Sequence, residues 1–238
     1  MKAGIYIYGA AALFLGAVGL AFADFADVWQ PVPKDLPLRT VLAYATGLAL
    51  VAGGLGVIVR RTRLAAALGL TVLFGLDVVL LHGANILAKP LELGSWSGAA
   101  EQLAVAAGGL ALWAGAVDPK SETAVKAARL IFGVCAICFG AVHFEYLQPT
   151  VNWVPKLFPD PVFWAALTGA AHIAAGIALL SDIKAKLAAR LSAIMYAVFG
   201  IFVHAPGLWA HPHDHFWWSA NAVNLTLIGA AWVLADEL

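Results

Sequence analysis

The chain has 238 residues, of which 62% are hydrophobic and only 12% are charged, and its mean hydropathy is +0.86. A soluble domain carries about a quarter charged residues, and a water-soluble globule could not bury so much apolar surface. Lysines and arginines number 14 and balance 14 aspartates and glutamates, so no net charge attracts nucleic acid. Two cysteines cannot form a disulfide scaffold. The composition therefore predicts an all-α integral membrane protein that contacts the lipid bilayer and binds no nucleic acid.

Eight stretches are long and apolar enough to span a membrane, since a span needs about 20 predominantly apolar residues. They cover residues 3–23, 39–59, 64–82, 96–117, 127–147, 161–181, 187–205 and 216–235. Prolines mark most of the gaps, as expected for turns and extended chain. Pro206 follows the seventh stretch, and we expect it to end that helix. The first stretch resembles a secretory signal peptide, but it is unusually long and has a counterpart later in the chain, so we expect it to be retained.

An internal repeat relates the two halves of the chain at an offset of 122 residues. The Val-Pro-Lys sequence that begins at Val32 recurs at Val154, and His82 recurs as His204. A position shared by both halves argues for a scaffold role, such as capping the C-terminus of a helix. The repeat predicts two four-helix units.

We place these four-helix bundles at residues 1–118 and 119–238. Four spans are an even number, so both units enter the membrane with the same orientation, as a parallel repeat. Ten of the 14 lysines and arginines lie on one side of the spans and four on the other. By the positive-inside rule, both termini lie in the cytoplasm of an inner-membrane protein, and the long loops face the periplasm.

Each four-helix unit is rich in glycine and alanine and has a polar outer loop after its third span, in the segments around His82 and His204. In these features the chain resembles the DoxX-like superfamily. The resemblance covers nearly the whole chain. It implies a membrane partner of redox systems, such as quinone-linked sulfur oxidation, oxidative-stress complexes or the maturation of periplasmic redox proteins. Some relatives are chaperones or cargo receptors without a reaction of their own. The resemblance carries no family-wide catalytic residue onto this chain.

Two acidic residues lie within the predicted spans, where an ionisable side chain is costly and therefore a functional hypothesis. Asp77 lies near the outer end of the third span and Glu101 near the outer start of the fourth, so a hairpin would place both at one depth. Two close carboxylates in a low dielectric would share a proton or hold a cation. The alternative is that each is bonded to a neighbouring polar group. We predict that the pair relays protons.

Histidines form the second group of candidates. His143 and Glu145 lie near the outer end of the fifth span and point away from each other, because they are two positions apart. His143 would ligate a metal or haem, hydrogen-bond a quinone carbonyl, or bind backbone or water. His172 lies in the middle of the sixth span, level with Cys135 and Cys138, and is a further candidate cofactor ligand. Cysteines in mid-span are more typical of packing than of redox chemistry.

The loop before the last span holds His211, His213 and His215. In extended chain their alternation would put three imidazoles on one face, which suits a transition metal such as zinc, copper or iron. Incidental metal binding is the alternative. Asn221 and Asn224, in the span below the loop, would line the same outer mouth and contact a cofactor.

Together these residues predict one asymmetric polar site near the outer leaflet. The favoured hypothesis is a membrane oxidoreductase, or the membrane subunit of one, that handles a quinone, a haem or a transition metal and works with a soluble or periplasmic redox partner. The competing hypothesis is a non-catalytic scaffold or chaperone whose polar groups lock the helices together. A third is a small-solute or metal-ion channel through one bundle. The sequence names neither a substrate nor an oligomeric state.

Overall fold

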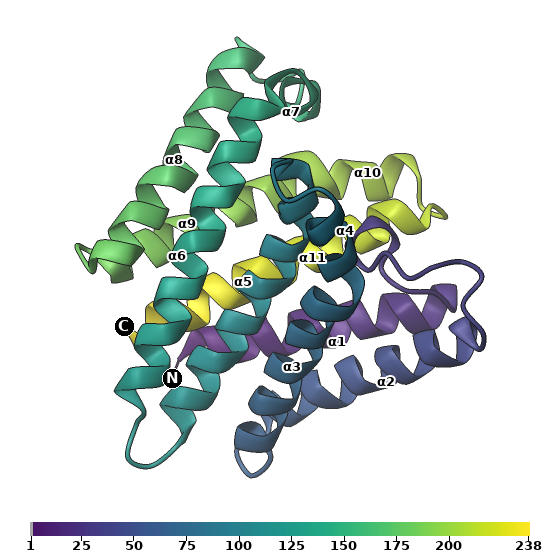
Figure 1. The fold of residues 1–238 in the computed structure, drawn as a ribbon, viewed down its shortest axis with the longest axis vertical. Coiled ribbons are helices and arrows are strands. Elements are labelled where there is room, and N and C mark those ends of the chain that lie inside the picture. Colours follow the sequence, from purple (N-terminus) through teal and green to yellow (C-terminus); the bar gives the residue numbers. More distant parts are fainter. Residues whose placement is uncertain (1) are drawn as a thin grey trace.

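The computed structural model describes residues 2–238, and all secondary-structure elements in that range are helices joined by loops (Figure 1). In chain order the elements are α1 (Ala3–Phe22), η1 (Asp27–Trp29), α2 (Arg39–Ile58), α3 (Arg63–Asp77), η2 (Val78–His82), α4 (Gly83–Ala88), α5 (Leu93–Ala116), α6 (Glu122–Glu145), α7 (Leu147–Trp153), α8 (Pro161–Ser181), α9 (Ala185–Phe199), η3 (Gly200–His204), α10 (Ala205–Ala210) and α11 (His215–Glu237). Within residues 2–238, seven helical segments are long and apolar enough to cross a membrane. The chain is an integral membrane protein.

The fourth predicted stretch, residues 96–117, forms the helix α5, which is not among those seven. Its first half carries Glu101 and Gln102 and is less apolar than the other spans. The helix packs against α3, α6 and α11, and it lies in the middle of the molecule in Figure 1. A helix surrounded by other helices can carry polar side chains because they face protein rather than lipid.

Helix contacts follow the same order in the two halves. In the first half α1 packs on α2, α2 on α3 and α3 on α5, and in the second half α6 packs on α8, α8 on α9 and α9 on α11. Two further contacts, α5 with α6 and α11 with α1, join the halves, and α5 crosses α11 between them. At that crossing Gly108 lies against Ala230, which stands 122 residues later in the sequence.

Glycines allow the helix pairs to approach closely, as small residues do in membranes. A Cβ atom added to Gly47 on α2 would lie 3.1 Å from the carbonyl oxygen of Gly16 on α1. The pair α6 and α8 has the same arrangement, because a Cβ atom added to Gly140 would lie 2.6 Å from the carbonyl oxygen of Gly169. Larger side chains at these crossings would push the helices apart.

The third and seventh helices are longer than predicted. The third helix passes through a π-helical turn at Val78–His82 and continues as the short helix α4. The seventh passes through a π-helical turn at Gly200–His204 and continues as the short helix α10. The prediction that Pro206 ends the seventh helix is therefore wrong. The π turn changes the hydrogen-bond register, so Pro206 falls in the first turn of α10, where its missing N–H is not needed.

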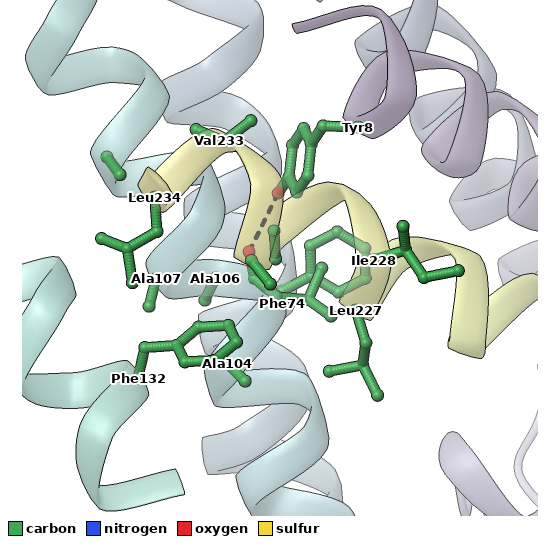
Figure 2. Packing of buried hydrophobic residues seen from close by; sticks show 14 of the residues in the cluster. Tyr8, Phe74, Ala104, Ala106, Ala107, Phe132, Leu227, Ile228, Val233 and Leu234 are labelled. Atoms are coloured by element: carbon green, nitrogen blue, oxygen red, sulfur yellow. Dashed lines mark hydrogen bonds between the residues drawn. The ribbon is translucent and has the colours of Figure 1, made fainter. Parts of the chain in front are cut away.

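The core lies where α1, α3, α5 and α11 meet, and Figure 2 shows part of it. Tyr8 on α1 is only 1% exposed, and its hydroxyl donates a hydrogen bond to the carbonyl oxygen of Val105 on α5 at 3.1 Å. A buried tyrosine usually finds such a partner, because an unsatisfied hydroxyl in a core is costly.

The two ends of the chain meet at one side of the molecule, as Figure 1 shows. The Nζ atom of Lys2 lies 2.6 Å from a carboxylate oxygen of Glu237, whose side chain is buried. The backbone N–H of Gly4 donates to Asp236 at 2.8 Å, and Lys120, between α5 and α6, donates to the carbonyl oxygen of Glu237 at 2.7 Å. These contacts tie both termini to the connection between the halves.

Candidate functional site

A cavity of about 700 Å³ lies in the second half of the molecule, between α7, α8, α9, η3 and α11. Its wall is mainly apolar and rich in aromatic side chains, among them Trp153, Phe158, Trp164, Phe202 and Phe216. Several of these rings pack on one another, with centroids 5.2 Å apart for Phe158 and Trp164 and 5.5 Å apart for Phe158 and Phe202. The cavity therefore suits an apolar ligand of substantial size.

A smaller cavity of about 190 Å³ adjoins the first and has a more polar wall. Glu101 on α5, His143 on α6 and His204 at the end of η3 line both cavities and so form their common boundary. The inner cavity also contains His172 on α8 and Asn224 on α11. Polar groups from five elements thus converge at the inner end of an apolar cavity.

The hydrogen bonds of His143 and His172 determine which ring nitrogen carries the proton. Nδ1 of His143 lies 2.7 Å from the carbonyl oxygen of Phe139, and Nδ1 of His172 lies 2.9 Å from that of Thr168. A carbonyl oxygen can only accept, so in both rings Nδ1 donates. The hydrogen bonds of residues 2–238 leave Nε2 of both rings free. In the neutral form each Nε2 therefore offers a lone pair to a ligand.

Two buried polar atoms at this site have no hydrogen-bond partner in the part of the chain that the structure describes. They are the hydroxyl of Tyr196, a residue that is 2% exposed, and Nδ1 of His204. The neighbouring Asn224 donates its amide to the backbone carbonyl of Tyr196, at 3.0 Å, and makes no hydrogen bond with the hydroxyl. Buried polar groups are nearly always paired, so these two atoms are available to a ligand.

Four of the residues singled out from the sequence meet at these cavities: Glu101, His143, His172 and Asn224. The rings of His143 and His172 lie side by side, with centroids 4.9 Å apart. His172 is 2% exposed and also contacts the ring of Tyr196, at 5.6 Å between centroids. The structure thus brings together one carboxylate, two imidazoles and one amide.

Three other predicted residues lie outside both cavities. The carboxylate of Asp77 accepts a hydrogen bond from Gln30 at 2.9 Å, so it has a different neighbour from Glu101 and the expected acid pair is not seen. Glu145 is exposed at the last residue of α6. Asn221 donates to the backbone carbonyls of His204 and Trp217, at 3.0 and 2.8 Å, and so holds α11 against η3.

The structure does not gather His211, His213 and His215 into one cluster. His211 stacks on Trp217 and His215 stacks on Phe22, with centroids 6.2 and 4.4 Å apart. The expected alternation requires extended chain, but α11 already begins at His215. Over residues 2–238, no group of three or more His, Cys, Asp or Glu side chains is placed to hold a metal ion.

Sequence reasoning missed three residues of the site: Tyr196, His204 and Trp29, which lines both cavities. Tyr196 stands 122 residues after Phe74, so a comparison of the halves could have found its extra hydroxyl. His204 was assigned to the scaffold because it is repeated, yet its Nδ1 is unpaired. Trp29 gave no signal, because it lies in a loop outside the spans.

Comparison with known proteins identifies the domain that holds most of this site. Residues 124–205 match the family model DoxX. The membrane protein therefore contains a segment similar to DoxX. The matched segment carries His143, His172, Tyr196 and His204, whereas Glu101 comes from outside it. No curated protein and no solved structure matches the chain.

Proposed function

We propose that this protein binds a quinone in the cavity of its second half, with the quinone head against the polar inner end. The observation that carries the proposal is the unpaired, buried Tyr196 hydroxyl at the end of an apolar, aromatic cavity. A quinone combines a planar ring, an apolar tail and two carbonyl oxygens that accept hydrogen bonds. Its head fits a wall that supplies a hydroxyl donor, and its tail fits the aromatic cavity.

The side chains of the inner cavity have distinct roles in this proposal. The Tyr196 hydroxyl donates to a carbonyl oxygen of the ligand. Nε2 of His143 accepts a hydrogen bond or a proton from a hydroxyl of the reduced form, the quinol, because its Nδ1 is already committed to Phe139. Glu101 has no ion-pair partner among residues 2–238, and it accepts or returns a proton beside the histidine. A bound quinone supplies two-electron, two-proton redox chemistry, and a periplasmic redox partner would exchange the electrons.

The residues fit a quinone better than a haem held by two histidines. Two axial imidazoles bind on opposite faces of the iron, and two metal–nitrogen bonds of about 2 Å each would keep their centres at least about 6 Å apart. The centroids of His143 and His172 are 4.9 Å apart, so these rings do not fit on either side of a macrocycle.

A binding titration tests the proposal. Decylubiquinone, added to the purified protein in detergent, should quench tryptophan fluorescence saturably, because Trp29, Trp153 and Trp164 line the cavity. Glu101→Leu should weaken binding by roughly two- to tenfold, since a protonated Glu101 carboxyl donates a hydrogen bond to a quinone carbonyl and such a bond contributes roughly 0.5–1.5 kcal/mol. Glu145→Leu is the matched control and should leave binding unchanged, because Glu145 is exposed outside the cavities. Absence of saturable quenching, or equal loss in both variants, would argue against a quinone site.

The membrane arrangement that accompanies this function has eight spans in two parallel four-helix units, at residues 1–118 and 119–238, with both termini cytoplasmic. The equivalent helix contacts, the repeated glycine crossings and the two π turns support the two units. The ten-to-four distribution of basic residues supports the orientation. In intact cells a membrane-impermeant maleimide should label His213→Cys, whereas the exposed Ile183→Cys should react only after lysis. The reverse labelling pattern would show that the protein has the opposite orientation in the membrane.

A non-catalytic scaffold or partner subunit is the second candidate function. Asn221 and Asn224 favour it, because both amides donate to backbone carbonyls of neighbouring helices and lock those helices together. A scaffold would lose its fold when these amides are removed but would bind no quinone. Decylubiquinone binding that fails in the fully folded native protein would therefore favour this candidate.

A further inference from the structure

One wall of the quinone cavity comes from the other half of the chain. Trp29 lies in η1, between α1 and α2, yet its side chain lines both cavities of the second half. Its indole packs on Phe216 of α11, with ring centroids 5.6 Å apart. The position of this loop residue therefore helps to determine the shape of the cavity.

Two buried side chains of the first half hold the backbone of Trp29. Nε2 of His82 donates to the carbonyl oxygen of Trp29 at 3.2 Å, and the amide of Gln102 donates to the same oxygen at 3.0 Å. His82 is 5% exposed and Gln102 is 2% exposed. Two donors from η2 and α5 thus converge on one loop carbonyl, and a buried arrangement of this kind fixes the loop.

The next residue, Gln30, is held from a third element. Its amide nitrogen donates to the carboxylate of Asp77 at 2.9 Å, and its amide oxygen accepts from the backbone N–H of Ala26 at 3.0 Å. Gln30 is 4% exposed. Asp77 therefore orients the amide that closes the turn around Trp29.

Equivalent positions in the second half make no such clamp. Asp77 corresponds to Phe199, and Gln102 corresponds to Asn224, which donates to a carbonyl of α9 instead of a loop. His82 corresponds to His204, whose Nδ1 is unpaired. The positions that hold a loop in the first half therefore line an open cavity in the second.

We infer that Asp77, His82 and Gln102 are positioning residues that hold Trp29 as the cross-unit wall of the ligand cavity. This inference rests on the proposed function and assigns the first unit a role in it: the first unit shapes the site that the second unit contains. Asp77 acts through Gln30, while His82 and Gln102 act directly on the carbonyl of Trp29. None of the three lines either cavity.

The clamp can be tested without any ligand by hydrogen exchange. The amides of Trp29, Gln30 and Val32 are hydrogen-bonded within the loop and should exchange slowly in the native protein. Gln102→Leu should accelerate their exchange by roughly tenfold, because one buried hydrogen bond to the loop is lost. Tyr8→Phe is the matched control, because it also removes one buried bond to a backbone carbonyl but does not touch the loop. Equal exchange in Gln102→Leu and the native protein would overturn the inference.

A double-mutant cycle then tests whether the clamp acts through the indole. Gln102→Leu and Trp29→Ala should each weaken decylubiquinone binding by roughly five- to tenfold, and the double variant should bind no more weakly than Trp29→Ala alone. Additive losses, or unchanged affinity in Gln102→Leu, would overturn the inference while the quinone site stands. Failure of the native protein to bind decylubiquinone would instead overturn the proposed function, and the exchange measurement would still decide whether the loop is clamped.

Discussion

Tyr196 and Tyr8 form a matched pair for testing whether the inner cavity is reserved for a ligand. Both side chains are buried, with 2% and 1% of their surface exposed. The hydroxyl of Tyr8 donates to the carbonyl oxygen of Val105 at 3.1 Å, whereas the hydroxyl of Tyr196 has no partner in residues 2–238. Replacing either tyrosine with phenylalanine removes one oxygen atom and keeps the ring.

The two substitutions should affect the free energy of unfolding differently. Tyr8→Phe removes a satisfied hydrogen bond and should lower it by about 1 kcal/mol. Tyr196→Phe removes a desolvated hydroxyl without a partner, so stability should stay the same or rise by up to about 1 kcal/mol. In a chain of this length, 1 kcal/mol corresponds to a change in Tm of about 2–4 °C. Quinone affinity should fall by about five- to tenfold in Tyr196→Phe and stay unchanged in Tyr8→Phe.

Thermal unfolding in detergent, followed by circular dichroism with and without decylubiquinone, measures both effects. A ligand that binds only the folded state raises the Tm by mass action, so the size of the rise reports affinity. Tyr8→Phe should start from a lower Tm and show the full rise, whereas Tyr196→Phe should start at or above the native Tm and show a smaller rise. If Tyr196→Phe melted as far below the native protein as Tyr8→Phe and kept the full rise, the reasoning would be refuted. The Tyr196 hydroxyl would then be bonded within the protein.

Two further predictions concern the scaffold, and the same unfolding measurement checks both. Gly176→Ala should lower the free energy of unfolding by about 1–3 kcal/mol, because the new Cβ would lie 2.7 Å from the carbonyl oxygen of Gly133. Gly75→Ala, whose Cβ would meet nothing within 4 Å, should leave stability unchanged or raise it by up to about 1 kcal/mol, and a loss equal to that of Gly176→Ala would contradict the packing argument. Glu237→Ala should cost about 1 kcal/mol, because its buried carboxylate pairs with the N-terminal lysine at 2.6 Å. Glu92→Ala breaks an exposed pair and should change little, and equal losses in the two variants would show that burial of the carboxylate is unimportant.

The sequence alone determined where helices form and how they are related along the chain. Each of the eight predicted stretches forms a helix, because a hydrocarbon solvent demands about 20 consecutive apolar residues and leaves no other way to satisfy the backbone. Both halves also carry glycines at corresponding helix pairs. Gly16 and Gly140 both lie at close helix crossings, since only a residue without a side chain permits that approach.

Part of the candidate site followed from the same reasoning. Glu101, His143, His172 and Asn224 stood out as polar residues in apolar helices, and the structure brings all four to one pair of cavities. Depth in the membrane can be counted along a helix, which explains why residues of similar predicted depth lie near one another. Asp77 was placed at the same depth as Glu101, yet its neighbour is a loop glutamine.

Tertiary structure decided which of these side chains meet, because that depends on how each helix is rotated about its axis and where the loops fold back. Trp29 shows this most clearly, since a loop of the first half supplies a wall of the second half's cavity. Tyr196 and Tyr8 look alike in the sequence, but only packing leaves one hydroxyl bonded and the other free. Hydropathy describes each helix along one dimension only. A binding site requires several helices to converge in three dimensions.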